Sequence, residues 1–419
     1  LSFLALPIRD FYYYICRCMA AEWRLLLMKN CIVGQSGGPT AVINSSLAGV
    51  IKACLNTPEI GEILGAVNGV EGIINDNFVH LEQTFSNQTN YKYLMQTPAS
   101  YLGSCRVKLP NEKENPEIYE QIFSVFEQHN VGYFFYIGGN DSMDTVDKLN
   151  DYAKAHEIDV RIMGVPKTVD NDLPITDHTP GFGSAAKYIA ATVREAALDA
   201  SVYDLKSVLI IEMMGRNAGW LTAASALART NGLPAPHLIY LPENPFSLEE
   251  FLEDVREKIE KYTSVVVCVS EGIKFEDGTY VCETTSSGLT DVFNHKNLSG
   301  TAKFLENAVR ENIGCKARGV ELNVCQRCAA HMLSKNDVLE AERIGYDAVI
   351  YAIAGISGEM MIFNRVSNVP YTLKTASVPI KEAANLEKTI PSDWITKNDV
   401  TQKMIEYLTP LIQGEPDIR

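Results

Sequence analysis

Five segments of the chain share one layout, in which an apolar run typical of a buried strand leads into a turn rich in Gly or in charged residues. The runs start at Asn30, Val131, Asp159, Ser207 and Ser264, and a helical pattern follows the first, second and fourth turns. Continuous apolar strands that alternate with helices are typical of parallel sheets covered on both faces. The sequence therefore predicts an α/β fold. Ligands of such folds bind beyond the carboxyl ends of the strands, where all five polar turns fall.

The length of 419 residues exceeds the size at which a single core keeps growing, so we expect two domains or one very large one. The stretch PITDHTPGFGS, near residues 175–185, provisionally separates two groups of these units, which makes a site between two lobes plausible. Residues 1–27 are apolar and aromatic but lack the uninterrupted core and cleavage site of a signal peptide. We treat them as an extension of unknown status, with Met28 as a more natural beginning of the fold.

The formal net charge of −15, with Lys and Arg scattered along the chain, argues against nucleic acid or an anionic membrane surface as a partner. A small anionic ligand remains compatible, since its site needs only a few local cations. Among ten cysteines, only Cys325 and Cys328 have a CxxC spacing, and without a second pair a structural role is favoured over zinc. We expect a reduced cytoplasmic protein.

A glycine-rich turn, GQSGGPT, follows the first apolar run. Gly34, Gly37 and Gly38 permit close approach of the backbone, and the N–H groups of a following helix can bind an anion. A tight strand-to-helix turn explains the same glycines equally well.

The second turn, IGGNDS, combines Gly138 and Gly139 with three residues that offer oxygen groups at a helix start, Asn140, Asp141 and Ser142. Such groups suit a hydrated Mg²⁺ or a phosphate. Taken alone, a simple helix cap made by Asp141 or Ser142 is the preferred explanation.

The third turn, PKTVDND, is the hardest to explain as a solvated loop, because it places several reactive groups directly after a buried strand. Lys167 is a point charge suited to phosphate, and Thr168 offers a hydroxyl. Asp170 could take a proton from a substrate hydroxyl as a general base, and Asp172 could hold a metal or tune Asp170. This density predicts a functional site.

Further charged residues fall in the remaining turns. Arg216 follows the fourth strand and could bind phosphate bidentately, and Glu271 ends the fifth, as a sugar-hydroxyl acceptor or a helix cap. Each of Arg106, Arg318 and Arg327 alone would more often be a surface ion pair. Their shared place in loops at one edge of the sheets favours a ligand site.

Taken in order, the motifs GGNDS, PKTVDND, MMGR, SEG and RGVELNVCQR resemble the phosphofructokinase family, and more narrowly its pyrophosphate-dependent members. The resemblance runs from about Met28 through at least Arg327, with weaker similarity to the end. No single piece is specific, but the ordered combination is.

The resemblance implies the phosphofructokinase fold, with two Rossmann-like lobes of mostly parallel sheets and the active site in the cleft between them. The donor lobe is expected at residues 28–175 plus about 328–390. The lobe that binds fructose 6-phosphate is expected at 176–327 plus about 391–419.

The resemblance also implies roles for single residues. Asp170 becomes the base that deprotonates the 1-hydroxyl of fructose 6-phosphate, with Lys167 and Thr168 as its catalytic companions. Arg318 is expected to reach the site of a neighbouring subunit in a homo-oligomer, a dimer or a tetramer. The substrate-binding set is Thr168, Asp170, Asp172, Met214, Gly215, Arg216, Glu271, Arg318 and Arg327, and the donor-binding set is Gly37, Gly38, Arg106, Gly139, Asn140, Asp141 and Ser142.

Asp141 and Lys167 stand where ATP-using members usually have glycines. A carboxylate at the first position would repel the α-phosphate of a nucleotide, and a cation at the second would serve a shorter donor, so both indicate pyrophosphate. Two departures from the family pattern stand out. Asn140 replaces a common Asp, which puts direct metal binding there in doubt, and Val324 replaces a His that touches the sugar in ATP-using relatives.

The implied reaction is a reversible, Mg²⁺-dependent phosphoryl transfer from pyrophosphate to fructose 6-phosphate, giving fructose 1,6-bisphosphate and phosphate. Asp141 and Asp172 are the candidate metal ligands. The alternatives are an ATP-dependent 6-phosphofructokinase and a catalytically silent regulatory subunit. The silent subunit is expected to lose the Asp pair, which is intact here.

Overall fold

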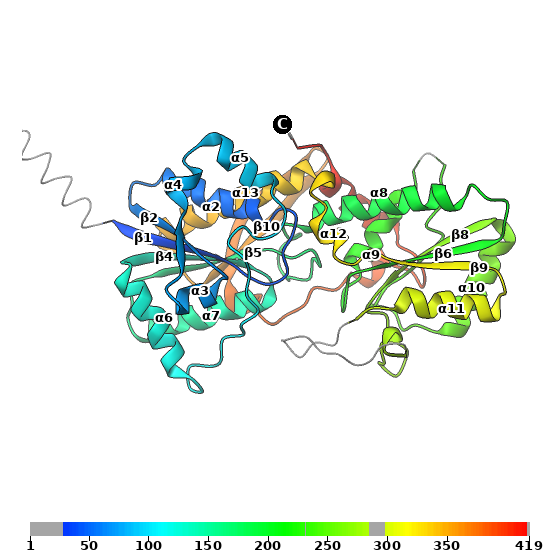
Figure 1. Ribbon diagram of the computed structural model, residues 1–419, viewed down its shortest axis with the longest axis horizontal. Helices are drawn as coiled ribbons and strands as arrows, with labels where there is room; N and C mark the ends of the chain where they lie inside the picture. The colour runs from blue at the N-terminus through cyan, green and yellow to red at the C-terminus, as the bar shows by residue number, and fades with distance from the viewer. Residues whose placement is uncertain (1–27, 231, 285–297, 417–419) are drawn as a thin grey trace, which may run out of the picture.

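The computed structural model describes residues 28–230, 232–284 and 298–416, which form two lobes, each built around its own sheet (Figure 1). The predicted α/β class with mostly parallel sheets is confirmed. The prediction for residues 1–27 concerns a segment outside the described residues. No helix in the described ranges is both long enough and apolar enough to cross a membrane.

The first lobe contains a seven-stranded sheet. Its five central strands are parallel, and an antiparallel strand closes each edge. In order across the sheet, the strands are β11 (Tyr371–Pro379), β10 (Glu359–Asn368), β5 (Arg161–Pro166), β4 (Val131–Gly138), β1 (Lys29–Gln35), β2 (Ile60–Ala66) and β3 (Phe78–His80).

Helices cover both faces of this sheet, as its continuous apolar strands predict. Along β1, Ile32 packs into the core on one face, whereas Cys31 and Val33 pack into the core on the other. The first face is covered by α3 (Val70–Ile74), α6 (Pro116–Gln128) and α7 (Asn140–Ala155), and the second by α2 (Ile43–Leu55), α4 (Leu81–Phe85), α5 (Gln88–Gln96) and α13 (Lys335–Ile353).

The second lobe contains a parallel four-stranded sheet, again buried on both faces. Leu209 and Ile211 of its central strand face one core, and Val208 and Ile210 face the other. The strand order is β7 (Leu238–Tyr240), β8 (Ser264–Ser270), β6 (Ser207–Met213) and β9 (Lys316–Glu321). One face packs against α8 (Phe182–Ala200), α9 (Trp220–Ala224) and α14 (Gln402–Leu408), and the other against α10 (Leu248–Lys261) and α11 (Thr301–Asn312).

The chain crosses between the lobes more than once. All strands of the first sheet lie within 29–166 and 359–379, and all strands of the second lie within 207–321. The C-terminal helix α14 then packs in the core of the second lobe. Which lobe binds which substrate stays a prediction.

Candidate active site

Three of the predicted motifs meet at one edge of the first sheet, because β1, β4 and β5 are parallel neighbours that end side by side. Gln35 lies opposite Ile137, and Gly138 lies opposite Pro166. The backbone N–H of Lys167 donates to the carbonyl oxygen of Gly138 at 2.9 Å. The glycine turn, the IGGNDS turn and the PKTVDND turn therefore form one surface.

Lys167 is the buried cation of this surface, with 2 % of its area exposed. Its Nζ donates to the carbonyl oxygen of Gly38 at 2.7 Å and lies 3.4 Å from the place that a Cβ on Gly37 would occupy. Burial lowers the pKa of Lys167 to about 8, although the carboxylates of Asp170 and Asp172 act in the opposite direction. The glycines thus leave room for a buried cation that donates to the carbonyl oxygen of Gly38.

Two arginines lie near the glycine turn and Lys167. Nη1 of Arg327, which is carried by α12 (Cys325–Cys328), lies 3.2 Å from where a Cβ on Gly38 would be. Arg106 follows Cys105, whose carbonyl oxygen accepts the N–H of Gly37 at 3.2 Å. The charges of both arginines contribute to the lowered pKa of Lys167, so positive charge gathers around the glycine turn.

The IGGNDS turn differs in detail from the cap that its sequence suggests. Helix α7 begins at Asn140, and its N-cap is Gly139, so neither Asp141 nor Ser142 caps it. Ser142 instead packs against Gly138, where a Cβ would lie 1.9 Å from its Oγ. Asp141 sits in the first turn of α7, where the helix dipole favours a negative charge.

The side chain of Asn140, which was predicted to bind the donor, makes two hydrogen bonds to backbone groups. Its Nδ2 donates to the carbonyl oxygen of Leu386 at 2.7 Å, and its Oδ1 accepts the N–H of Asn385 at 2.5 Å. Both ends of the amide therefore hold a segment that is more than 240 residues away in the sequence.

The loop that carries the two aspartates is fixed by its own polar groups. Oγ1 of Thr168 accepts the N–H of Asp170 at 3.1 Å, and the carbonyl oxygen of Thr168 accepts the Thr179 hydroxyl at 2.7 Å. Asn171, between the aspartates, is fully buried and has a φ of 54°, in the left-handed region that Asn tolerates better than most residues. The loop is therefore held in one conformation.

The two aspartates have unusual acidities. Burial raises the pKa of Asp170, while the charges of Lys167, Arg216 and Arg327 oppose that rise. Burial also raises the pKa of Asp172, to about 7, and the neighbouring Asp170 adds to the effect. Since Arg216 follows β6 of the second sheet, the surroundings of Asp170 include charges from both lobes.

The acceptor side lies at the ends of β6 and β8. The N–H of Gly215 donates to Oε1 of Glu271 at 3.3 Å, and the N–H of Met214 donates to Oε1 of Gln326 at 3.2 Å. Burial raises the pKa of Glu271 to about 8, with a further contribution from Asp170. Three predicted residues, Met214, Gly215 and Glu271, are thereby brought together with Gln326 of α12, which was not predicted.

Arg318 is the predicted site residue that stands apart. It is exposed in the middle of β9, at the edge of the second sheet and opposite Leu209, rather than at the strand ends. Its predicted role in the site of a neighbouring subunit is not tested by a single chain.

Metal binding was predicted at Asp141 and Asp172. Within the described ranges, no group of three or more His, Cys, Asp or Glu side chains is arranged to hold a metal ion. Mg²⁺ usually takes only one or two protein carboxylates together with phosphate oxygens of the substrate. Asp172, which follows β5, and Asp141, in the first turn of α7, offer the hard carboxylate oxygens that this ion prefers, so these residues fit it. Cys325 and Cys328 are free, exposed thiols.

Several residues that contact the site carry no local signal in the sequence. Gln326 has only its place beside Arg327 to indicate a role. Glu387 and Lys388 come from a stretch without any motif, yet their charges act on Asp172. A polar pattern in that stretch does not distinguish it from an ordinary surface loop.

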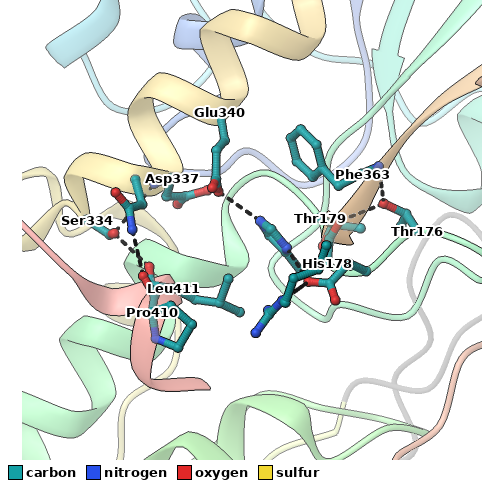
Figure 2. A network of polar contacts seen from close by, with 12 residues as sticks. Thr176, His178, Thr179, Ser334, Asp337, Glu340, Phe363, Pro410 and Leu411 are labelled. Carbon is teal, nitrogen blue, oxygen red and sulfur yellow. Dashed lines mark hydrogen bonds and ion pairs between the residues drawn. The ribbon is translucent and has the colours of Figure 1, made fainter. Parts of the chain in front are cut away.

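A buried polar network supports the loop after Asp172, and Figure 2 shows His178 at its centre. Nε2 of His178 lies 2.9 Å from Oε2 of Glu340 in α13, and Nδ1 lies 2.8 Å from Oδ2 of Asp177. The ring also stacks on Phe363 of β10, with centroids 4.9 Å apart. Thr176 donates its hydroxyl to the His178 carbonyl oxygen and accepts the N–H of Phe363. The network joins the loop to the first lobe.

His178 predicts a pH dependence of stability. Burial alone would lower its pKa, but Glu340 and Asp177 raise it to about 9. A pKa raised above the unfolded value of about 6.5 contributes stability that is complete below that pH and is lost as the pH rises through about 9. We expect the free energy of unfolding to lose about 3 kcal/mol from this group over that window.

Urea unfolding between pH 6 and pH 9.5, on the chain and on His178→Gln, measures this contribution. The difference between the two proteins isolates His178, since the buried lysines titrate in both. A difference that stays constant across the window contradicts the expectation.

Comparison with known proteins places these features in context. The family model described as Phosphofructokinase matches residues 30–352. A protein of Halomonas elongata named pyrophosphate–fructose 6-phosphate 1-phosphotransferase is 40 % identical over 92 % of both chains, and one of the same name from Xanthomonas campestris is 41 % identical over 92 % of both. The crystal structure of a pyrophosphate-dependent phosphofructokinase from Marinobacter aquaeolei matches with a TM-score of 0.82 and 38 % identity, covering 93 % of this chain and 92 % of that one.

Proposed function

The chain belongs to the phosphofructokinase family, and from this premise we propose that it transfers a phosphoryl group from pyrophosphate to the 1-hydroxyl of fructose 6-phosphate. The products are fructose 1,6-bisphosphate and phosphate. The observation that carries the proposal is Asp170, a carboxylate of raised pKa near Lys167 on the donor side and Arg216 on the acceptor side. Both similar proteins and the similar crystal structure bear names of pyrophosphate-dependent enzymes.

Asp170 takes the proton of the sugar hydroxyl as the nucleophile attacks. A carboxylate whose pKa is raised toward neutrality is a stronger base than an ordinary aspartate. Lys167, buried beside the glycine turn, faces the charge of the donor, and Arg106 and Arg327 add to that positive field. Catalysis then rests on placement and on charge stabilisation rather than on covalent chemistry.

The acceptor is held by groups at the ends of β6 and β8. Met214, Gly215, Arg216 and Glu271 bind the sugar phosphate in this proposal, and Arg327 closes on the 6-phosphate. Asp172 and Asp141 would hold Mg²⁺, which would supply further neutralisation of the phosphate charge. Since phosphate is also a competent acceptor, the reaction runs in both directions.

Pyrophosphate is favoured over ATP as the donor by two side chains. Lys167 fills the space beside the glycines with a cation, and Asp141 places a carboxylate in the first turn of α7. A nucleotide would bring its α-phosphate toward that carboxylate, whereas the shorter donor ends before it. The silent-subunit alternative conflicts with the intact pair Asp170 and Asp172.

The donor preference has a direct test. On one preparation, we expect initial rates of fructose 6-phosphate phosphorylation with pyrophosphate and Mg²⁺ to exceed those with ATP and Mg²⁺ by at least about 100-fold. This ratio corresponds to a few kcal/mol of discrimination, which we ascribe to the Asp141 carboxylate facing the α-phosphate of the nucleotide. Omission of Mg²⁺ with added chelator should abolish the rate. Activity with ATP alone would refute the donor assignment, and no activity with either would favour the silent subunit.

Arg318 bears on assembly. Its exposure on the edge strand β9 leaves it accessible to a second copy of the chain. We therefore retain the proposal of a homo-oligomer, a dimer or a tetramer, in which this arginine reaches the neighbouring site. A cytoplasmic location is likewise retained as a prediction from the cysteine content.

A further inference from the structure

The segment of residues 385–390, here called the strap, runs from the first lobe, which ends with β11, toward α14 in the second lobe (Figure 1). It has no helical or strand structure of its own. None of its residues belongs to the motifs that carry the proposed reaction, but it contacts the turns that carry three of them.

The strap is held at its beginning by the donor-side helix α7. The Asn140 amide accepts the N–H of Asn385 and donates to the carbonyl oxygen of Leu386, at 2.5 and 2.7 Å. Nδ2 of Asn385 also donates to Oδ1 of Asp144 at 3.1 Å. An amide at position 140 can donate and accept at once, whereas an ionised Asp would oppose the Leu386 carbonyl oxygen with a carboxylate. This requirement explains the Asn that departs from the family pattern.

Lys388 holds the middle of the strap against the catalytic loop. Its backbone N–H donates to the carbonyl oxygen of Asp172 at 2.7 Å. Its Nζ donates to Oδ1 of Asn171 at 3.2 Å and to the carbonyl oxygens of Thr176 and Asp177, both at 3.0 Å. The one ammonium group therefore donates to three acceptors, at Asn171 and further along the chain at Thr176 and Asp177. Three is the full donor capacity of a lysine.

The second lobe contacts the strap mainly through the turn after β6 and through helix α9. Nδ2 of Asn217 lies 2.9 and 3.0 Å from the two carboxylate oxygens of Glu387. Nε1 of Trp220 donates to the carbonyl oxygen of Lys388 at 2.9 Å, and the Lys388 ammonium lies 5.2 Å from the centroid of the same indole ring. The N–H of Ile390 donates to Glu243 at 3.1 Å.

We propose that the strap fixes the donor turn and the sugar turn at one separation across the catalytic loop, with Asn140 and Lys388 as its positioning residues. The proposal rests on the proposed function, because it assigns the strap a role in that same site. In-line transfer depends on the placement of donor and acceptor, and an error of about 1 Å can cost about 100-fold in rate. Neither residue is required to touch a substrate.

The test compares steady-state kinetics of Asn140→Ala, Lys388→Met and the double variant with those of the unmodified chain. We expect each single variant to lose about 10- to 100-fold in kcat, while KM for pyrophosphate and for fructose 6-phosphate stays within about 2-fold. Because both residues act through one segment, the kcat of the double variant should be little lower than that of the more impaired single variant. Lys381→Met is the matched control, since Lys381 is exposed shortly before the strap and pairs with Asp151 at 2.6 Å. It should keep normal kinetics.

A selective rise of KM for pyrophosphate in Asn140→Ala would overturn the proposal, because it would make Asn140 a donor ligand. The proposal would also be overturned if the kcat loss of the double variant equalled the product of the two single losses. Such a result would indicate that the two residues have independent roles. Should Lys388→Met fail to fold, Asn140→Ala carries the test alone, because its side chain is partly exposed.

Amide hydrogen exchange in the ligand-free protein separates failure of this proposal from failure of the proposed function. If the unmodified chain has no phosphotransferase activity, the function is wrong, and exchange still tests the strap. We expect exchange at residues 385–390 to rise by at least about 10-fold in Asn140→Ala, because the opened segment loses a hydrogen bond at each of two successive residues. Unchanged exchange there would contradict the strap.

Discussion

Asp170→Asn should lower kcat for the reaction with pyrophosphate by about 10²- to 10⁴-fold, the usual contribution of a general base. The substitution keeps the shape of the side chain but removes the carboxylate that accepts the hydroxyl proton. The hydrogen bond that the backbone N–H of Asp170 donates to Oγ1 of Thr168 does not depend on the carboxylate, so the loop should keep its conformation. KM values for both substrates should change far less than kcat.

Steady-state rates in both directions measure this effect, and Asp347→Asn serves as the matched control. Asp347 is another largely buried aspartate, which pairs with Arg343 on α13 and contacts Thr375 on β11, outside the site. Near-normal turnover of Asp170→Asn would remove the carboxylate from the role of base. A similar loss in the control would show that the effect is structural.

Lys167→Met should be nearly as damaging, with a loss of about 10²- to 10³-fold in kcat, comparable to the removal of one preorganised electrostatic group. The methionine retains the length of the side chain but removes the buried ammonium that lies between the glycine turn and the aspartates. Lys167 donates to the Gly38 carbonyl oxygen, so the variant also leaves that acceptor without its partner. A higher KM for pyrophosphate should accompany the lower kcat if the lysine binds the donor.

The control is Lys148→Met, which removes a partly buried lysine of the same lobe. Lys148 pairs with Asp144 at 2.7 Å and donates to the carbonyl oxygen of Leu109. Thermal unfolding midpoints of both variants show whether a loss of rate reflects a loss of fold. Full activity of a folded Lys167→Met would contradict the charge-stabilisation argument and the donor argument together.

The meeting of three motif-bearing turns could be predicted from the sequence because parallel strands carry their turns to one edge. Lys167 and Asp170 follow β5, and Gly37 and Gly139 follow the neighbouring strands β1 and β4. Apolar runs specify the strands, and the order of strands and helices specifies a parallel sheet. The place of those turns at one edge of the sheet can therefore be predicted from the sequence alone.

The individual partners of these residues could not be predicted in the same way. His178 pairs with Glu340, 162 positions away, and Asn140 with the backbone near residue 385. Arg327, predicted to close on the sugar phosphate, lies beside Gly38 of the donor turn. No local pattern records such contacts, since they depend on how helices and lobes pack after the strands have formed.

The sequence by itself determined the α/β class, the five polar turns after the strands and the residue types on which the proposed chemistry depends, because hydrophobic periodicity and turn composition are local properties. Only the tertiary structure decided that Lys167 is buried and donates to the carbonyl oxygen of Gly38, that Asn140 contacts the strap and that Lys388 contacts the loop of the two aspartates. Their neighbours come from distant parts of the chain. Burial and hydrogen bonding, which set their charges and roles, exist only once the two lobes are assembled.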